Sequence, residues 1–535
     1  MKRFQSLWLS LLSGLLLYAA WPVSPFTFII FFAFVPLFFV ADATLKKNHF
    51  FLYTFIAFLV WNIATTWWIW NSAPEPSIAA FVCNSLFMCL PWWGYFTFKK
   101  KYGKRTGYVA LVAFWMAFEY IHLNWQLSWP WLTVGNVFAS HPNWVQWYEY
   151  TGVSGGTLWV LLINIGLKEA FQKFQKFEIS SFRFRVSGLK RLSVTVFLGL
   201  IIVPFIISFV ILLNIKSTIS ISGSNVLIVQ PNIDPYQKFN NSSTAQQIAQ
   251  LVQLSEQNLD SSTRLILWPE TAMSDHEWQD HIAENFTYKP VFNFVNRHPN
   301  LTLLSGIDTY KNYGLKKTTQ TAHKAGNGIY YDAFNTAIAI KANTPFQLYN
   351  KSKLVPGAES LPTFLNFLGP VFEQFGGTTG GYGRSDSSKV FTEKSNPYVA
   401  APVICYESIY GEYVASYVQR GANIITIITN DGWWGNTPGH KQHLQYARLR
   451  AIETRRWVAR SANTGISAVI NNRGDILETR PWNEAAIVKY AIPVCTKETF
   501  YVTYGDYLYK VATVFAALLL GWNVADWLIK RLIKK

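Results

Sequence analysis

A thiol and a carboxylate stand together after one short apolar run of the sequence. The run 401–404 predicts a buried strand, and Cys405, Tyr406 and Glu407 follow it directly. In an α/β fold, ligands bind at the carboxyl ends of strands, so a cysteine in this position is typical of a nucleophile. The alternative is a buried cysteine without chemistry, because cysteine is among the residue types found most often in protein interiors.

Two further reactive groups stand at the ends of predicted strands. Glu270 comes after the apolar run 265–268, and Lys351 comes after the run 347–350. A carboxylate can accept the thiol proton, and an ammonium group can stabilise an oxyanion. Together with Cys405 they predict an acyl-transfer site, on the condition that the three groups meet in space. Taken singly, Glu270 is compatible with a carboxylate at a helix N-terminus, and Lys351 with a surface lysine.

The elements around these groups alternate between strands and helical stretches. Apolar, β-rich runs predict strands at 225–230, 265–268, 301–307, 333–342, 347–351, 401–404, 424–429 and 466–470. Residues 439–462 have helical spacing with many arginines, and the polar segment 312–328 predicts a surface insertion. The class of this part of the chain is therefore α/β or layered α+β.

The rest of the chain is strongly apolar. Stretches with about the length needed to span a bilayer lie at 5–21, 25–41, 50–70, 78–98, 107–123, 151–167, 192–214 and 508–529. The first stretch is also compatible with a signal peptide. However, Trp21-Pro22 is an unfavourable sequence to follow a cleavage site, and we predict an uncleaved helix. We therefore expect a membrane domain of seven helices (1–214), a catalytic domain (215–507) and an eighth helix with a tail (508–535).

The net charge of +17 belongs to the membrane segments. Residues 1–214 carry 16 Lys+Arg against 6 Asp+Glu, and residues 508–535 carry 5 against 1, whereas residues 215–507 carry 26 against 23. Alternate loops and both chain ends hold 20 Lys+Arg, and the opposite short loops hold none. This positive-inside pattern predicts cytoplasmic termini and a catalytic domain on the outer face, and it argues against a nucleic-acid partner.

Two features of the apolar part admit more than one interpretation. The loop 124–150 is rich in tryptophan, which indicates an interfacial aromatic belt, the wall of a lipid-access groove, or both. Glu119 lies in an apolar run, either at the membrane interface or inside the helix bundle, where carboxylates are functional candidates.

The cysteines and histidines predict no cofactor site. The four cysteines form no disulfide framework, although a Cys405–Cys495 bridge is the alternative in an oxidising compartment. His440 and His443 stand three apart, a spacing that metal sites use, but no third ligand accompanies them and we interpret them as one face of a helix. We predict neither a metal nor another cofactor.

The motifs, taken in order, resemble those of a known family. LILWPET (265–271), YNKSKLVPGAES (349–360) and ICYES (404–408) resemble the Glu, Lys and Cys motifs of the nitrilase (carbon–nitrogen hydrolase) superfamily. The eight-helix frame around them resembles that of the apolipoprotein N-acyltransferase family, so that the resemblance covers nearly the whole chain. It implies a multi-pass α-helical membrane domain plus a nitrilase-like αββα sandwich domain on the periplasmic face of the cell inner membrane.

The resemblance also implies a reaction and a role for each residue. An acyl chain would pass from a phospholipid, typically phosphatidylethanolamine, through a Cys thioester to the N-terminal amine of a diacylated apolipoprotein. Glu270 resembles the general base, Lys351 the oxyanion-stabilising lysine and Cys405 the nucleophile. Glu359 and Glu407 resemble the supporting carboxylates of the family, and Tyr406 resembles the aromatic residue beside the nucleophile. Trp433 stands in the segment TNDGWWG, which resembles a further segment of the family near the site. Phe239 and the pair Gly357-Ala358 depart from the family pattern. These departures affect the contacts expected of local loops and leave the three reactive residues as they are.

An acyl chain needs an apolar route to such a site. The segment 363–383 combines a glycine cluster with four phenylalanines: Phe364, Phe367, Phe372 and Phe375. We predict a lipid-access arm that dips into the membrane, with the glycines as hinges. The alternative is a segment packed in the core.

Two other functions use the same sequence features. A membrane-anchored amidase or nitrilase that hydrolyses a small amide would need the same three reactive residues, but a single anchor would suffice for it. A transporter or scaffold with an inactive enzyme domain would explain the helices, but it leaves the intact reactive set and the scarcity of charge inside the helices unexplained.

Overall fold

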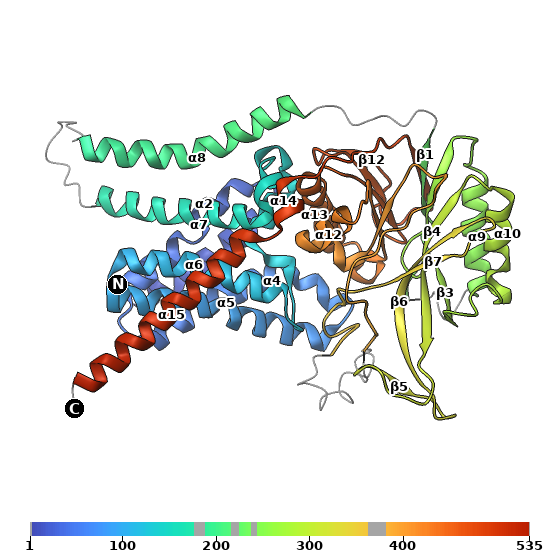
Figure 1. Cartoon of the computed structure of the whole chain (residues 1–535). Helices are drawn as coiled ribbons and strands as arrows, with labels where there is room; N and C mark the ends of the chain where they lie inside the picture. Colours follow the sequence, from blue (N-terminus) through green and yellow to red (C-terminus); the bar gives the residue numbers. More distant parts are fainter. Residues whose placement is uncertain (1–2, 176–187, 216–223, 237–242, 362–380, 534–535) are drawn as a thin grey trace. The chain divides into compact units, whose positions relative to one another are not determined.

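The computed structural model describes residues 3–175, 188–215, 224–236, 243–361 and 381–533. By its internal contacts the chain divides into two compact units. The first comprises Met1–Trp67, Ser77–Asn214 and Asp506–Lys535, and the second comprises Trp68–Pro76 and Ile215–Gly505. In Figure 1 the helices of the first unit run from blue through teal to green (α8), with α15 in red, and the strands of the second unit run from green to brown.

The first unit is helical. Its helices are α1 (Arg3–Ala20), α2 (Ile30–Ala33), α3 (Val35–Ala43), α4 (Lys47–Thr66), α5 (Pro74–Tyr102), α6 (Lys104–Leu123), α7 (Tyr148–Gln175), α8 (Gly188–Asn214) and α15 (Tyr507–Ile533). Among the described residues, six segments are long and apolar enough to cross a membrane: Lys47–Asn71, Pro74–Tyr102, Lys104–Leu123, Tyr148–Gln172, Thr195–Asn214 and Tyr507–Ile533. The predicted stretch 5–21 corresponds to α1. The predicted stretch 25–41 corresponds to the shorter apolar segment Thr27–Ala43.

Large apolar side chains of α8 and α15 lie on the surface of this unit. Phe209 and Leu213 of α8 and Val514 and Leu518 of α15 are all exposed. An apolar surface of this extent is unfavourable in water and is satisfied by lipid or by another protein. The exposed faces therefore agree with membrane-spanning helices.

Glu119 of α6 lies inside the first unit and its carboxylate is fully hydrogen-bonded. Oε1 accepts the indole N–H of Trp115 at 3.0 Å and the backbone N–H of Val134 at 2.8 Å, and Oε2 accepts the hydroxyls of Thr157 at 2.7 Å and Tyr509 at 2.6 Å. A buried carboxylate is tolerated when its oxygens are satisfied in this way. Glu119 thus joins α6 to α7 and α15 inside the unit.

The second unit contains two β-sheets. The first has the strand order β13-β1-β2-β4-β6-β5, with β3 beside β4 and β7 beside β6, and the second has the order β12-β11-β10-β9-β8. The strands of the first sheet are β1 (Asn225–Gln230), β2 (Thr263–Leu267), β3 (Met273–Trp278), β4 (Thr302–Asn312), β5 (His323–Lys324), β6 (Tyr330–Lys341), β7 (Gln347–Asn350) and β13 (Ala486–Tyr490). Those of the second are β8 (Ala400–Ile404), β9 (Ile424–Thr429), β10 (Trp457–Ala462), β11 (Ala468–Ile470) and β12 (Ile476–Thr479).

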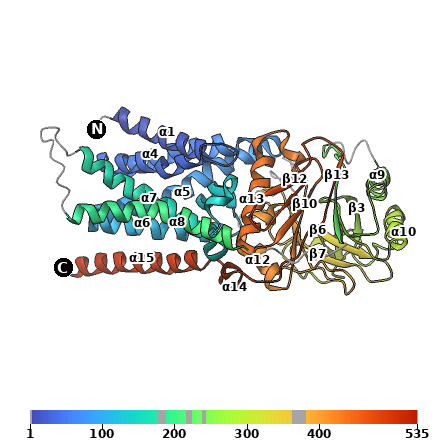
Figure 2. The same ribbon diagram turned by 90° about the horizontal axis from the view of Figure 1, so that it is seen from above.

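The two sheets pack face to face, and helices cover their outer faces (Figure 2). α9 (Thr244–Glu256) and α10 (Lys289–Arg297) lie on the first sheet, and α12 (Gly411–Gln419) and α13 (Pro438–Thr454) lie on the second. The layers follow the order α, β, β, α. This confirms the predicted multi-pass helical part plus nitrilase-like αββα sandwich.

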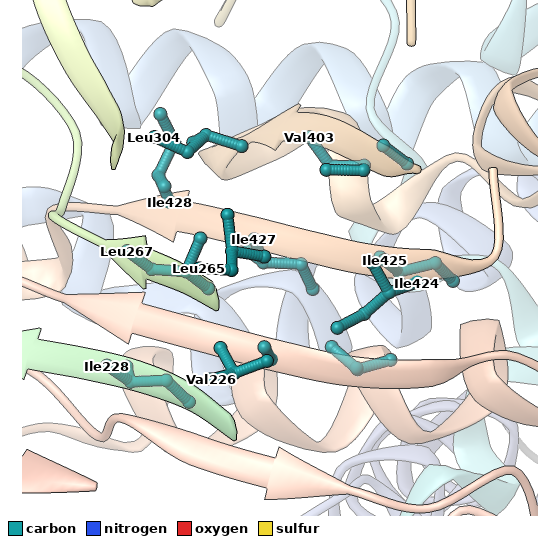
Figure 3. Close-up of a cluster of buried hydrophobic side chains, with 14 of the residues drawn as sticks. Val226, Ile228, Leu265, Leu267, Leu304, Val403, Ile424, Ile425, Ile427 and Ile428 are labelled. Atoms are coloured by element: carbon teal, nitrogen blue, oxygen red, sulfur yellow. The ribbon is translucent and has the colours of Figure 1, made fainter. Parts of the chain in front are cut away.

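Alternation along β1 shows how the sequence builds these layers. Val226 and Ile228 enter the core between the sheets, whereas Leu227 and Val229 belong to the core beneath α9 and α10. Successive side chains of a strand point to opposite faces, so a strand covered on both sides must be apolar throughout. Figure 3 shows side chains of both sheets meeting in the first of these cores, among them Leu267, Val403 and Ile427.

The segment predicted as one helix over 439–462 is two elements. α13 ends at Thr454, Arg455 follows with a left-handed φ of 50°, and the chain continues as β10. The helix prediction is wrong beyond Thr454. Arg456 and Arg460 have the spacing of a polar helix face, but both are buried and Arg460 forms an ion pair with Asp431 inside the sandwich.

Candidate active site

The three predicted reactive side chains all stand just beyond the carboxyl end of a strand. Glu270 lies three residues after β2, Lys351 follows β7, and Cys405 follows β8. β2 and β7 belong to the first sheet and run in the same direction, since β7 and β4 are both antiparallel to β6 and β4 is parallel to β2. β8 comes from the second sheet. The site therefore draws on both layers of the sandwich.

Lys351 is buried between two carboxylates. Its Nζ lies 3.1 Å from Oε1 of Glu270 and 2.8 Å from Oε1 of Glu359, and the lysine side chain is 1% exposed. Burial by itself lowers the pKa of a lysine, but the charges of Glu270 and Glu359 outweigh it and raise the pKa of Lys351 well above its usual value. Lys351 is thus a fixed cation.

An asparagine that sequence reasoning missed holds the same two carboxylates. Nδ2 of Asn335, in β6, donates to Oε1 of Glu270 at 2.8 Å and to Oε1 of Glu359 at 3.1 Å. The backbone N–H of Asn430 donates to the second oxygen of Glu270 at 3.0 Å, and that of Val355 donates to the second oxygen of Glu359 at 2.8 Å. Asn335 stands in the middle of a strand, and only its pairing across the sheet brings it to the site.

Cys405 is a buried free thiol in a left-handed backbone conformation. Its backbone φ is 49°, a value that residues other than glycine rarely adopt, and residues with such backbone conformations cluster at active sites. Burial raises the pKa of the Cys405 thiol, the charge of Glu270 raises it further, and the charge of Lys351 lowers it. Cys405 therefore lies within electrostatic reach of both Glu270 and Lys351. The thiol is free, so the alternative bridge to Cys495 is not formed.

Glu407 ties the end of β8, where Cys405 stands, to the end of β7, where Lys351 stands. Oε1 accepts the hydroxyl of Tyr349 at 2.6 Å and the backbone N–H of Ser352 at 2.7 Å, and Oε2 accepts the backbone N–H of Ile404 at 3.0 Å. Burial raises the pKa of this fully enclosed carboxyl above its usual value and outweighs the hydrogen bonds from Tyr349 and the backbone, which lower it. Because these partners flank Cys405 and Lys351, Glu407 fixes the separation of the two reactive groups.

The other predicted supporting residues differ in their surroundings. Tyr406 is buried, and its ring packs edge-on against that of Tyr410 at 5.4 Å. Trp433 lies at the surface of the second unit and packs edge-on against Tyr236, whose hydroxyl donates to the Trp433 carbonyl at 2.8 Å. The predicted lipid-access residues Phe364, Phe367, Phe372 and Phe375, like Phe239, lie outside the residues that the structure describes.

This arrangement suits acyl transfer through a thiol. A buried thiol lies within electrostatic reach of a carboxylate, a group that can accept a proton, and of an ammonium, a group that can stabilise negative charge on a carbonyl oxygen. Two sheets packed between helices, with this set of groups at the strand ends, define the class of the carbon–nitrogen hydrolases.

Comparison with known proteins agrees with that class. Residues 225–498 match the family described as carbon-nitrogen hydrolase, and the chain belongs to this family. Residues 13–166 match a second family, described as the apolipoprotein N-acyltransferase N-terminal domain. The predicted resemblance to apolipoprotein N-acyltransferases of the nitrilase superfamily is thereby confirmed.

Individual relatives are also named apolipoprotein N-acyltransferases. The chain is 29% identical over 524 residues to the apolipoprotein N-acyltransferase of Chlorobaculum tepidum, covering 96% of this chain and 95% of the relative. It is 27% identical to that of Rickettsia prowazekii, covering 78% of this chain and 77% of the relative. Among solved structures, a CN-hydrolase superfamily protein from Xanthomonas campestris is similar at 14% identity and a TM-score of 0.35, covering 57% of this chain and 97% of that one.

Proposed function

We propose that the protein transfers an acyl chain from a phospholipid to the N-terminal amine of a diacylglyceryl-cysteine apolipoprotein. One observation carries this proposal: a buried Cys–Glu–Lys site is joined, in one chain, to apolar helices that match the N-terminal domain of apolipoprotein N-acyltransferases. The named relatives match over both parts. An enzyme that hydrolyses a small soluble amide has no use for the helical part.

In the first half-reaction the donor acylates Cys405. The carboxylate of Glu270 takes the thiol proton as the sulfur attacks the ester carbonyl, and a C–S bond forms. The oxyanion is stabilised by the ammonium of Lys351 and by the backbone N–H of Tyr406. The ester C–O bond then breaks, the leaving lysophospholipid oxygen takes the proton from Glu270, and a thioester remains on Cys405.

In the second half-reaction the acceptor amine removes the acyl chain. The amine nitrogen attacks the thioester carbonyl, Glu270 takes a proton from it, and the same two donors stabilise the oxyanion. The C–S bond breaks, an amide forms, and the sulfur of Cys405 recovers the proton. The two substrates react in turn with one covalent intermediate, which is ping-pong chemistry.

The surroundings of Cys405 explain why a base is needed. Burial raises the pKa of its thiol, so the resting enzyme holds a protonated sulfur, which is a weak nucleophile. Hydrogen bonds from Asn335 and Asn430 fix the carboxylate of Glu270, the base in this proposal. Generating the thiolate only as the ester arrives protects a buried sulfur from other electrophiles.

We propose further that the catalytic unit is periplasmic and that both termini are cytoplasmic. The positive charge of alternate loops supports this orientation in the inner membrane. In this arrangement the acyl donor, phosphatidylethanolamine in our proposal, comes from the membrane that the helices span. The diacylated acceptor reaches the site from the same membrane.

The full chain, purified and mixed with phosphatidylethanolamine that carries a labelled acyl chain, provides the test. We expect label on Cys405 that neutral hydroxylamine releases, as it does from thioesters, and that passes to a diacylated peptide. Cys405→Ser loses the thioester, whereas the matched variant Cys495→Ser keeps it. Transfer of the label to water or to small amines alone would instead identify a hydrolase, and wild-type protein without label would refute the proposal.

A further inference from the structure

A buried hydrogen-bonded chain that the mechanism above does not use ends at the carbonyl of the nucleophile. Nε2 of His443 lies 3.2 Å from the carbonyl oxygen of Cys405 and 2.9 Å from Oγ of Ser408, and Ser408 donates its hydroxyl to the same carbonyl at 2.7 Å. Nδ1 of His443 lies 2.9 Å from Oδ1 of Asp431, and Oδ2 of Asp431 pairs with Arg460 at 2.5 Å. All four side chains are at most 1% exposed.

This chain is anchored at its far end and balanced in charge. Arg460, in β10, also donates to the carbonyl of Ile466 at 2.5 Å, and Thr429 donates its hydroxyl to Asp431 at 2.8 Å. Burial raises the pKa of Asp431, but Arg460 and His443 outweigh it and hold the pKa well below its usual value. Asp431 is therefore an anion paired with a fixed cation, and it orients the imidazole of His443 in α13 toward the short 3-10 helix η8 (Cys405–Ile409).

The carbonyl that His443 and Ser408 hold belongs to the peptide that joins Cys405 to Tyr406. In a trans peptide the C=O and the following N–H are rigidly fixed and point in opposite directions. Fixing the Cys405 oxygen on one side therefore aims the Tyr406 N–H to the other. The left-handed φ of Cys405 makes this peptide sensitive to its restraints, because the conformation is intrinsically unfavourable.

The arrangement of Ser408, His443 and Asp431 has the composition of a serine hydrolase triad, but its hydrogen bonds give it another role. The hydroxyl of Ser408 is committed to the Cys405 carbonyl and is enclosed, so it has no access to a substrate. The carboxylate of Asp431 is shared with Arg460, which a triad aspartate does not need. The chain therefore ends in a restraint on the backbone.

We propose that His443 is a positioning residue, which, together with Ser408, holds the Cys405–Tyr406 peptide so that its N–H faces the oxyanion. This inference rests on the proposed use of that N–H in acyl transfer. It assigns a role to a histidine whose sequence indicated only a helix face. His440 lies in the same helix and is equally buried, and its ring centroid lies 4.3 Å from that of Trp482. It serves as the matched control.

Two reactions of Cys405 separate this role from a general contribution to folding. Acylation by p-nitrophenyl butyrate or by labelled phosphatidylethanolamine develops an oxyanion, whereas alkylation by iodoacetamide displaces iodide and develops none. In the full chain, we expect His443→Ala to slow acylation at saturating donor on the order of 100-fold, with the apparent donor affinity unchanged within about 3-fold. Alkylation changes by less than about 3-fold, since the thiol itself is intact.

Three comparisons complete the experiment. His443→Gln, whose amide N–H can take the place of Nε2–H, regains at least about 10-fold of the lost acylation rate. Ser408→Ala slows acylation but not alkylation, and His440→Ala changes neither. Equal loss of both reactions in His443→Ala, unchanged acylation, or an equal effect of His440→Ala would overturn the inference.

The synthetic ester distinguishes this inference from the proposed function. Wild-type protein that is acylated by p-nitrophenyl butyrate but not by the phospholipid would refute the proposed donor, while the His443 variants still decide the positioning role with the ester. Wild-type protein acylated by neither donor would refute Cys405 as an acyl acceptor, and the inference about His443 would fall with it.

Discussion

At the scale of single residues, burial disfavours the charged form of both Cys405 and Lys351, but only the thiol stays neutral. It keeps Cys405 protonated by raising the pKa of its thiol, and it fails to neutralise Lys351 only because Glu270 and Glu359 hold the ammonium between them. The resting site therefore contains a neutral thiol beside a fixed cation. The pH dependence of thiol chemistry reports this directly.

We expect alkylation of Cys405 by iodoacetamide to rise about tenfold per pH unit from pH 7 to pH 9, without a plateau. A thiol whose pKa is raised stays protonated below that pKa, so its small thiolate fraction grows in proportion to hydroxide. Lys351→Met removes the nearby cation, raises the thiol pKa further and slows alkylation at every pH. Peptide-resolved mass spectrometry measures the rates.

The exposed Lys316 gives a control for the loss of a positive charge. Lys316→Met leaves the alkylation profile as in the wild type, because the substitution removes a charge that water screens. A plateau below pH 9 in the wild type, or faster alkylation in Lys351→Met, would contradict the assignment.

At the scale of elements, the carboxylate of Glu270 depends on the close approach of the segment after β2 to β4. The N–H of Gly306, in β4, donates to the carbonyl of Pro269 at 3.1 Å. A Cβ on Gly306 would lie 2.7 Å from the Cα of Glu270 and 2.3 Å from the backbone nitrogen of Thr271, which has a left-handed φ of 50°. Only glycine leaves room for the chain to turn here.

Gly306→Ala should therefore displace Glu270 from the thiol. We expect the acylation rate of Cys405 to fall on the order of 100-fold, since a base misplaced by about 1 Å loses this much. Gly326→Ala is the control, because a Cβ there meets no heavy atom within 4 Å. Single-turnover labelling measures both variants, and an unchanged rate in Gly306→Ala would show that the Glu270 segment adapts freely.

At the scale of the whole molecule, one chain combines a helical unit that exposes apolar faces with a sandwich that has two buried cores. The loops of the helical part divide by charge, which supports the proposed orientation of the chain in the membrane. The sandwich itself carries nearly balanced charge. Orientation is therefore a property of the loops that flank the helices.

The orientation predicts which side of the membrane each surface faces. In a chain with Cys83→Ser and Cys495→Ser, we expect Lys317→Cys to react with a membrane-impermeant maleimide added from the periplasmic side. Arg105→Cys, in the first turn of α6, reacts only after the inner membrane is permeabilised. Both side chains replaced are exposed in the structure. The opposite pattern of labelling would invert the proposed topology.

The sequence by itself determined the class of each layer and the position of three candidate catalytic residues after strands. Apolar runs mark strands whatever their neighbours are, and Glu270, Lys351 and Cys405 each follow such a run, so their positions at strand ends were predictable. The helical spacing of polar residues led to a wrong helix prediction at β10, because these residues are buried in the tertiary structure. There, Arg460 has a helix-like spacing but an interior partner.

Only the tertiary structure decided which groups meet. Asn335 reaches Glu270 across 65 residues of sequence, and Asp431 reaches Arg460 across 29, because strand register and the packing of two sheets bring them together. Periodicity in a sequence reports which face of an element is buried, but it does not report what lies opposite that face. The chain from Arg460 through His443 to the carbonyl of Cys405 was invisible for this reason.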